Sequence, residues 1–263
     1  MYYSDIAQRS LRFVNEKPDH ESKPHLPHIT PHVPGLHWGT GKIPGWLRET
    51  AGEPRWPVAI GVVLAIALQL ALPDRYALQP KYLLPVAELA LLVGLIAANP
   101  VRFQREHKII RWASLAMTIL IGLANFGSIV RLVNQILHGV PNAPKDYSTL
   151  LLSSALAIWI TNILVFALMY WEFDRGGPFS RAQGRKPYPD FLFTQMGDPS
   201  KAHEDWEPTF IDYAYVSFTN STSFSPTDTM PMSSWAKLLM MIQSIVSMLT
   251  IALVAAKAVG ILP

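Results

Sequence analysis

Five apolar runs of about twenty residues constrain this chain most, because each can cross a bilayer as a helix. The runs are Trp56–Pro73, Tyr82–Asn99, Ile109–Leu137, Leu150–Trp171 and Trp235–Leu262. A helix of about 20 residues covers the roughly 30 Å hydrocarbon core. Aromatic residues lie near the run ends, as is typical of membrane surfaces; they are Trp56, Tyr82, Trp112, Tyr170, Trp171 and Trp235. The pattern predicts an all-α integral membrane protein with about five transmembrane helices.

The composition also indicates a chain that lies in a lipid bilayer, its expected partner. Half of the 263 residues are hydrophobic and only 16% are charged, which is apolar for a soluble domain. The chain has no cysteine, so disulfides, thiolate metal sites and cysteine catalysis are excluded. The net charge is only +3 and the basic residues form no run, which argues against nucleic acid as a partner. Nucleotide-binding and hydrolase motifs are absent, so we expect neither an enzyme nor a cofactor.

The runs divide the chain into three regions: a polar segment over 1–56, a three-helix membrane region over 57–149, and a module over 150–263. The first segment is dense in proline, which predicts extended backbone. It also holds five histidines, His20, His25, His28, His32 and His37. These could chelate a metal if the chain folded back. Because proline opposes that convergence, we expect a polar tail and no metal site.

A short helix is predicted between the fourth and fifth runs, from about Thr209 to Ser221. Acidic residues and a proline precede it, which suits the start of a helix. The helix is too short to span a bilayer, and it leads directly into a hydroxyl-rich stretch before the last run. It is therefore a candidate re-entrant helix of the pore type.

The stretch from this helix onward resembles the pore module of tetrameric potassium channels, which reads Y-F-S-x-x-T-x-T-T-V-G-Y-G-D-x-x-P. Tyr215–Ser217 matches its start, Thr222–Phe224 stands at T-T-V, and Asp228–Pro231 matches D-x-x-P. Lys237 then precedes an apolar helix, as the family's basic residue does. The resemblance covers 150–262 and implies a homotetramer around an ion path. The stretch "FTNSTSFSPTDTMP", Phe218–Pro231, also resembles one in an uncharacterised bacterial membrane-protein family. We therefore expect the protein to lie in the bacterial cytoplasmic membrane.

The departure from the family concerns its selectivity filter. The filter-like residues here are Thr222, Ser223, Phe224, Ser225, Pro226, Thr227 and Asp228, with Ser-Pro-Thr in place of G-Y-G. Proline fixes its own φ and restricts the residue before it, so the potassium filter should not form. Hydroxyl groups would line a pore instead. This predicts weak selectivity, a different ion, or no conduction.

The last run carries polar residues on one helical face, namely Gln243, Ser247, Thr250 and Lys257. In a tetramer we expect this face to line the pore; otherwise its Ser and Thr pack between helices and Lys257 reaches the membrane surface. Two function hypotheses stay open. One is a channel-like protein with a hydroxyl-lined filter. The other is a non-conducting accessory or scaffold subunit of a larger membrane complex.

Charged residues inside or beside the runs are further candidates. Glu88 is the carboxylate well inside a run, and Arg131 is its expected partner. The two form a structural pair or take part in a proton or ion relay; alternatively, Glu88 is protonated. At the end of the fourth run, "WEFDRGG" predicts a helix end with a local ion pair.

The distribution of basic residues conflicts with the channel resemblance. With five spans and the N-terminus inside, the cytoplasmic segments hold 16 Lys and Arg and the outer loops hold three. The positive-inside rule favours this orientation. It places the pore-type loop on the cytoplasmic side, opposite to potassium channels but as in ionotropic glutamate receptors. A miscounted span, with Trp56–Pro73 the candidate, is the other explanation.

Overall fold

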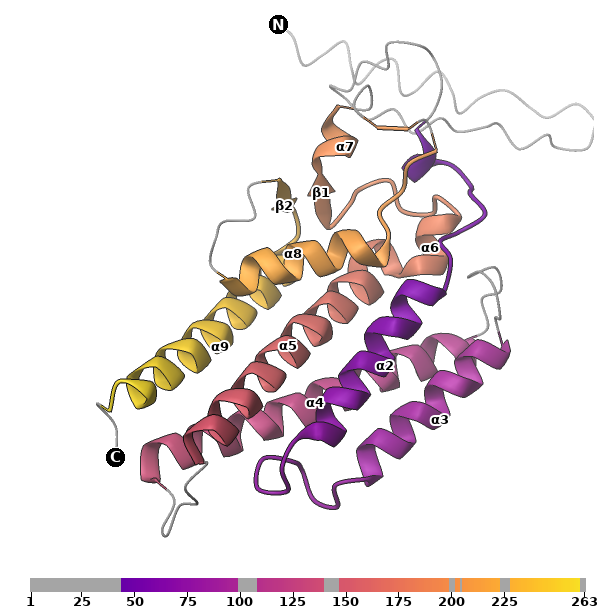
Figure 1. Ribbon diagram of the computed structural model, residues 1–263. Helices are drawn as coiled ribbons and strands as arrows, with labels where there is room; N and C mark the ends of the chain where they lie inside the picture. The colour runs from indigo at the N-terminus through magenta and orange to yellow at the C-terminus, as the bar shows by residue number, and fades with distance from the viewer. Residues whose placement is uncertain are drawn as a thin grey trace, which may run out of the picture. The chain divides into compact units, whose positions relative to one another are not determined.

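The computed structural model describes residues 44–98, 108–139, 147–198, 202–203, 205–222 and 228–260. The long helices are α2 (Trp56–Ala71), α3 (Leu83–Ala98), α4 (Lys108–His138), α5 (Tyr147–Phe173), α8 (Phe210–Thr222) and α9 (Ser234–Ala258). Shorter elements are η2 (Gly45–Leu47), η3 (Asp174–Gly176), α6 (Pro178–Ala182), α7 (Thr194–Gly197), β1 (Phe191–Phe193) and β2 (Thr229–Pro231). The protein is mostly helical, as its apolar runs predict (Figure 1).

Each of the five apolar runs forms a helix in the structure. Three of them, Ile109–His138, Tyr147–Gly176 and Ser234–Lys257, are long and apolar enough to cross a membrane, which indicates an integral membrane protein. The α2 and α3 helices have 16 residues each. At 1.5 Å per residue they extend about 24 Å, less than the hydrocarbon thickness. Three of the five predicted spans are therefore supported by helix length.

Helix α5 lies at the centre of the described helices, in contact with α2, α4, α8 and α9 (Figure 1). Its side chains are buried around most of its circumference, including Ile158, Leu168 and Trp171. The helices further from the centre expose apolar side chains, such as Val86 of α3 and Leu123 of α4. Exposed apolar faces on this scale are typical of helices that face lipid.

Helix α8 runs alongside α5, starting at its C-terminal end. The Phe210 ring lies 6.3 Å from the Trp171 ring, measured between centroids. Two turns later, the Ser217 hydroxyl donates to the carbonyl oxygen of Ile163 at 2.7 Å. The last residues of α8 therefore lie beside the middle of α5. The predicted short helix is confirmed, with bounds within one residue of the expectation.

The chain after α8 returns to the end of α5 where α8 begins. Strand β2 pairs antiparallel with β1, and Figure 1 shows the two strands next to each other. Asp190 anchors this junction, since its carboxylate accepts from the backbone N–H of Arg175 at 2.9 Å and from Trp235 Nε1 at 2.9 Å. Phe210, at the start of α8, and Pro231, in β2, thus lie at the same end of α5.

The polar segment predicted over 1–56 does not stay apart from the helices throughout. Trp46 and Leu47 are buried in the main hydrophobic cluster, and Glu53 and Arg55 are buried just before α2. Residues 44–55 therefore belong to the packed structure. The five histidines of the predicted tail lie outside the described residues.

Candidate functional site

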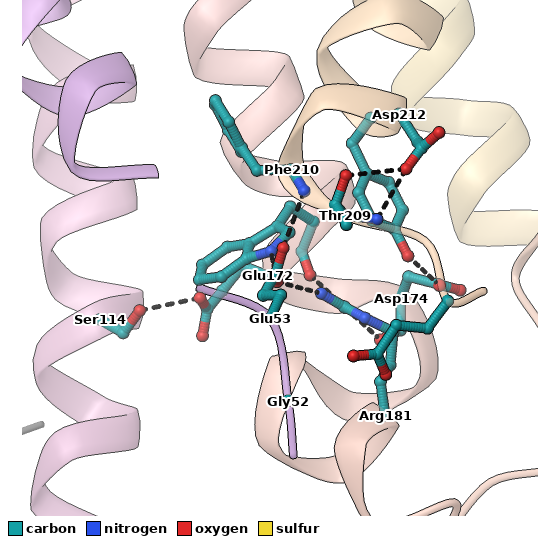
Figure 2. Close-up of polar contacts among 12 residues, drawn as sticks. Gly52, Glu53, Ser114, Glu172, Asp174, Arg181, Thr209, Phe210 and Asp212 are labelled. Carbon is teal, nitrogen blue, oxygen red and sulfur yellow. Dashed lines mark hydrogen bonds and ion pairs between the residues drawn. The ribbon is translucent and has the colours of Figure 1, made fainter. Parts of the chain in front are cut away.

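A cluster of charged side chains, all buried except the half-buried Arg111, lies where α5 ends and where α2 and α8 begin (Figure 2). We call it the charged cluster, and it consists of Glu53, Arg111, Glu172, Asp174 and Arg181. Its members come from five segments: the residues before α2, the start of α4, the end of α5, η3 and α6. If the chain crosses the bilayer five times, these segments all lie on the side of the membrane that holds most of the lysine and arginine residues.

Arg181 is the centre of the charged cluster, with 3% of its surface exposed. Its Nη2 lies 3.3 Å from Glu53 Oε1, while Nη1 donates to the backbone oxygens of Trp171 at 2.5 Å and Asp174 at 3.2 Å. The guanidinium also lies 5.0 Å from the centroid of the Tyr213 ring. A buried guanidinium is tolerated where carboxylate and carbonyl oxygens balance its charge and accept from its donors. Arg181 thus ties α5, α6 and α8 together.

Glu172 has a partner from a distant part of the sequence. Its carboxylate accepts from Arg111 Nη1 at 2.5 Å and from the Ser114 hydroxyl at 2.8 Å, both on α4. The predicted local ion pair within "WEFDRGG" is therefore wrong for this residue. Gly177 follows with φ +95°, and a Cβ there would collide with the Arg111 guanidinium. The glycine lets Arg111 approach closely.

Glu53 joins the start of α8 to the charged cluster. Its carboxylate accepts from the Phe210 backbone N–H at 2.9 Å and from the indole of Trp171. Burial raises the pKa of Glu53 to about 7, although the charge of Arg181 acts in the opposite direction. The carboxyl group therefore changes its charge near neutral pH, at the position that holds the first turn of α8.

A second set of polar side chains, which we call the polar seam, lies between α5, α8 and α9. Gln243 of α9 is completely buried and uses both ends of its amide. Its oxygen accepts from the Tyr170 hydroxyl at 2.6 Å and from Asn220 Nδ2 at 2.9 Å. Its nitrogen donates to the Ser217 hydroxyl at 2.7 Å and to the Ser217 carbonyl at 2.9 Å. The amide therefore fixes the position of α8 on α9.

The polar seam continues one turn further along α9 and reaches α4. The hydroxyls of Ser221 and Ser247 lie 2.7 Å apart. Asn162 Nδ2 donates to Ser247 at 3.2 Å, and Asn125 Nδ2 donates to the Asn162 side-chain oxygen at 3.1 Å. Neutral amides and hydroxyls from four helices therefore meet in the interior.

The candidate pore-lining residues of α9 point into the chain that carries them. Gln243, Ser247 and Thr250 are buried, and the Thr250 hydroxyl donates to the Val246 carbonyl at 2.8 Å. Lys257 is partly exposed near the end of α9. The face of α9 that is exposed in a single chain is apolar and includes Met241 and Ile245. Pore lining by the polar face stays a prediction, while packing between helices is its observed arrangement.

Only the two ends of the filter-like stretch belong to the described residues. Thr222 ends α8, and its hydroxyl donates to the backbone oxygens of Phe218 and Thr219. Asp228 is exposed and accepts from the Tyr215 hydroxyl at 3.4 Å. The remaining filter-like residues, Ser223, Phe224, Ser225, Pro226 and Thr227, lie outside the described residues.

Glu88 and Arg131 are buried or half-buried as expected, but they have different partners. Glu88 accepts from Gln69 Nε2 at 3.1 Å, a contact between α3 and α2. Arg131 donates to the carbonyl oxygen of Ala77. The expected pairing of Glu88 with Arg131 is therefore wrong: α2 and the loop after it supply the nearer partners. Whether Glu88 takes part in a relay stays a prediction.

The sequence reasoning missed the residues that organise the charged cluster, above all Glu53, Arg181 and Tyr213. Tyr213 donates to Asp174, which also accepts from the Asp190 backbone N–H at 2.9 Å. No local motif marks these residues. The sequence signal that could have found them is the alternating direction of consecutive membrane helices. It brings the charged residues beside the first, third and fourth runs to the same end of the helix bundle.

No family model, curated protein or solved structure matches this chain. The functional argument therefore depends on the geometry described above.

Proposed function

We propose that the protein is a channel-like membrane protein in which α8 enters the bilayer from one side and the chain returns to that side. In this proposal, four copies surround a common axis because one chain supplies one pore-type loop. The hydroxyl-rich stretch from Thr222 to Asp228 forms the constriction. Without the G-Y-G glycines, the pore selects differently from a potassium channel.

One observation carries this proposal: the excursion of α8 along α5. Ser217 bonds to Ile163 and Ser221 contacts Ser247, both well inside the long helices. Strand β2 then lies beside β1 and Asp190, at the end where α8 begins. A long helix, a short helix, a return segment and a second long helix occur in this order, as in a pore loop. A surface loop would not place α8 against the middle of two apolar helices.

The electrostatics of α8 suit a cation path at its end. Unpaired carbonyl groups give the C-terminus of a helix partial negative charge, and here that end precedes the hydroxyls of the filter-like stretch. Both features favour a cation over an anion near Thr222. The exposed face of α9 would contribute apolar side chains, so the hydroxyl-rich stretch would be the main polar part of the path.

The second candidate is a non-conducting accessory or scaffold subunit. The observation that favours it is the direction of the polar residues on α9. Because Gln243, Ser247 and Thr250 satisfy their hydrogen bonds within the chain, the polar seam has a structural role without any pore. The outward apolar face of α9 would then contact lipid or another subunit.

Conduction by purified protein in planar bilayers tests the choice. We expect currents from the wild type and their loss or altered selectivity in the double variant Ser225→Leu and Thr227→Leu. Ser153→Leu is the matched control, since it adds the same side chain at an exposed hydroxyl of α5 and should leave currents unchanged. Equal currents in wild type and double variant would remove the pore-lining assignment.

The oligomeric state separates the two candidates independently of conduction. Electron microscopy of the detergent-solubilised protein should show a four-fold particle with Thr222–Asp228 around the axis. A monomer, or a single copy bound to unrelated subunits, would support the accessory role instead.

A further inference from the structure

We propose that Arg175, Trp46 and Lys186 form a binding site for an oxyanion of the phosphate class, next to the charged cluster. The site does not depend on conduction, since it involves the residues that cover the end of α5. It uses groups that neither the charged cluster nor the polar seam engages.

Three buried donors at this position have no acceptor. Arg175 has 1% of its surface exposed and Trp46 has 5%. Arg175 Nη1 and Nη2 and the indole Nε1 of Trp46 have no hydrogen-bond partner among the described residues. The guanidinium lies over the indole ring, 5.6 Å from its centroid. Buried donors without acceptors are unfavourable, so a cluster of three indicates that an acceptor belongs there.

The backbone holds Arg175 so that only its terminal nitrogens remain available. Its N–H donates to Asp190 Oδ2 at 2.9 Å, and its Nε donates to the Lys186 carbonyl at 2.7 Å. Its φ of 51° is unusual for a residue with a side chain, and the two hydrogen bonds fix it there. The remaining edge of the guanidinium presents two parallel donors, which match the oxygens of a phosphate.

A further cation lies close to Arg175, and the carboxylates whose charge acts on Arg175 accept hydrogen bonds from other groups. A Cβ on Gly176 would lie 3.3 Å from Lys186 Nζ, so the ammonium group is next to the residue after Arg175. Asp174 and Glu207 are the carboxylates whose charge acts on Arg175. Asp174 accepts from Tyr213 and from the Asp190 N–H, while Glu207 accepts from the Thr50 hydroxyl at 2.8 Å. Among the described residues, neither carboxylate accepts from Arg175 Nη1 or Nη2, and in our proposal a ligand supplies that acceptor.

The set of donors and its position indicate the class of ligand. Three donors beside an ammonium group, with no acceptor among them, suit an oxyanion better than a neutral molecule. Arg175 is the second-to-last residue of the candidate span Tyr147–Gly176, where a lipid phosphate would lie if α5 spans a bilayer. An anionic lipid headgroup and free phosphate share this chemistry, and the experiment distinguishes them.

The test measures thermal unfolding of the full chain in neutral detergent. The protein is titrated with inorganic phosphate, with a short-chain phosphatidylglycerol, and with phosphatidylcholine of equal chain length as the uncharged control. Three variants are compared. Trp46→Phe removes one donor and keeps the ring under Arg175; Arg175→Lys keeps the charge and loses the paired donors; Arg185→Lys changes an exposed neighbour.

We expect phosphate, phosphatidylglycerol or both to raise the unfolding temperature, and phosphatidylcholine to leave it unchanged. A response to phosphatidylglycerol alone identifies a lipid headgroup, and a response to phosphate identifies a free oxyanion. The apparent affinity should fall about fivefold in Trp46→Phe and about tenfold or more in Arg175→Lys, with no change in Arg185→Lys. The proposal is overturned if neither ligand stabilises the wild type, or if Trp46→Phe and Arg175→Lys respond as the wild type does.

Discussion

The two ends of α8 are held by different chemistry. At its start, the carboxylates of Glu53 and Asp174 accept from the Phe210 backbone and the Tyr213 side chain, and the buried Arg181 balances their charge. At its end, Asn220 and Ser221 bond to neutral amides and hydroxyls of α9. One helix of 13 residues thus passes from an ionic to a neutral environment.

This difference indicates that buried ion pairs and neutral hydrogen bonds suit different depths in a membrane. An ion pair at mid-bilayer is costly, whereas a pair near the membrane surface keeps access to water around its edges. Neutral amides and hydroxyls can join helices at any depth, and each contributes a modest amount. Such a gradient is what we expect if α8 starts at a membrane surface and ends deeper, as we propose. The following predictions test it, from the largest expected effect to the smallest.

Removing the central cation should have the largest effect. In Arg181→Met, Glu53 and Asp174 lose the charge that balances them, and we expect a loss of about 3–5 kcal/mol in the free energy of unfolding. Denaturant titration in mixed micelles measures it. Arg185→Met, at an exposed arginine of the same loop, is the control and should change stability by less than about 0.5 kcal/mol. Similar stability of the two variants would contradict the role of Arg181.

The stability of the protein should also depend on pH through Glu53. The pKa of Glu53 is about 7 in the folded protein, above the ordinary glutamate value of 4.5, so the folded state binds the extra proton between these values. Stability should therefore fall as pH rises from about 4.5 to 7, by about 2–3 kcal/mol from this residue. Unfolding measured across this window should show a smaller fall in Glu53→Gln. The control Glu49→Gln, at an exposed carboxylate, should keep the wild-type slope; equal slopes in all three proteins would refute the assignment.

Breaking the neutral end of α8 should cost less. Gln243→Leu removes the acceptor of the Tyr170 hydroxyl, one of the two acceptors of Asn220 Nδ2 and a donor to the Ser217 carbonyl, and we expect a loss of about 2 kcal/mol. Met241→Leu, on the exposed face of α9, should have little effect on unfolding. If Gln243 lined a pore instead, its substitution would alter currents and leave stability near that of the Met241 control.

A single hydroxyl of the polar seam should have the smallest effect. Ser247→Ala removes the contacts to Ser221 and Asn162, and we expect a loss of about 0.6 kcal/mol, the usual scale for hydrogen bonds between membrane helices. Ser153→Ala, at an exposed hydroxyl of α5, is the matched control. A loss as large as that in Arg181→Met would show that the neutral end of α8 is as sensitive as the charged one.

Local patterns predicted the helices well, because helix formation in apolar runs depends on neighbouring residues. The predicted short helix from about Thr209 to Ser221 corresponds to α8 (Phe210–Thr222), and Ile109–Leu137 corresponds to α4 (Lys108–His138). The lengths of two helices were predicted less accurately, since α2 and α3 are shorter than the apolar runs that contain them. The charged cluster was not predicted, because its members are far apart in sequence and follow no local spacing.

The sequence by itself determined the helical class, the apolar runs and the grouping of Gln243, Ser247 and Thr250 on one face, since spacing along a helix fixes which residues share a side. Only the tertiary structure decided what that face contacts. It placed Gln243 and Ser247 against α5 and α8 and buried Thr250, and it matched Glu172 with Arg111 and Glu88 with Gln69. The physical reason is that a buried polar group is stable only beside a partner, and the packing of distant helices decides which partner is within reach.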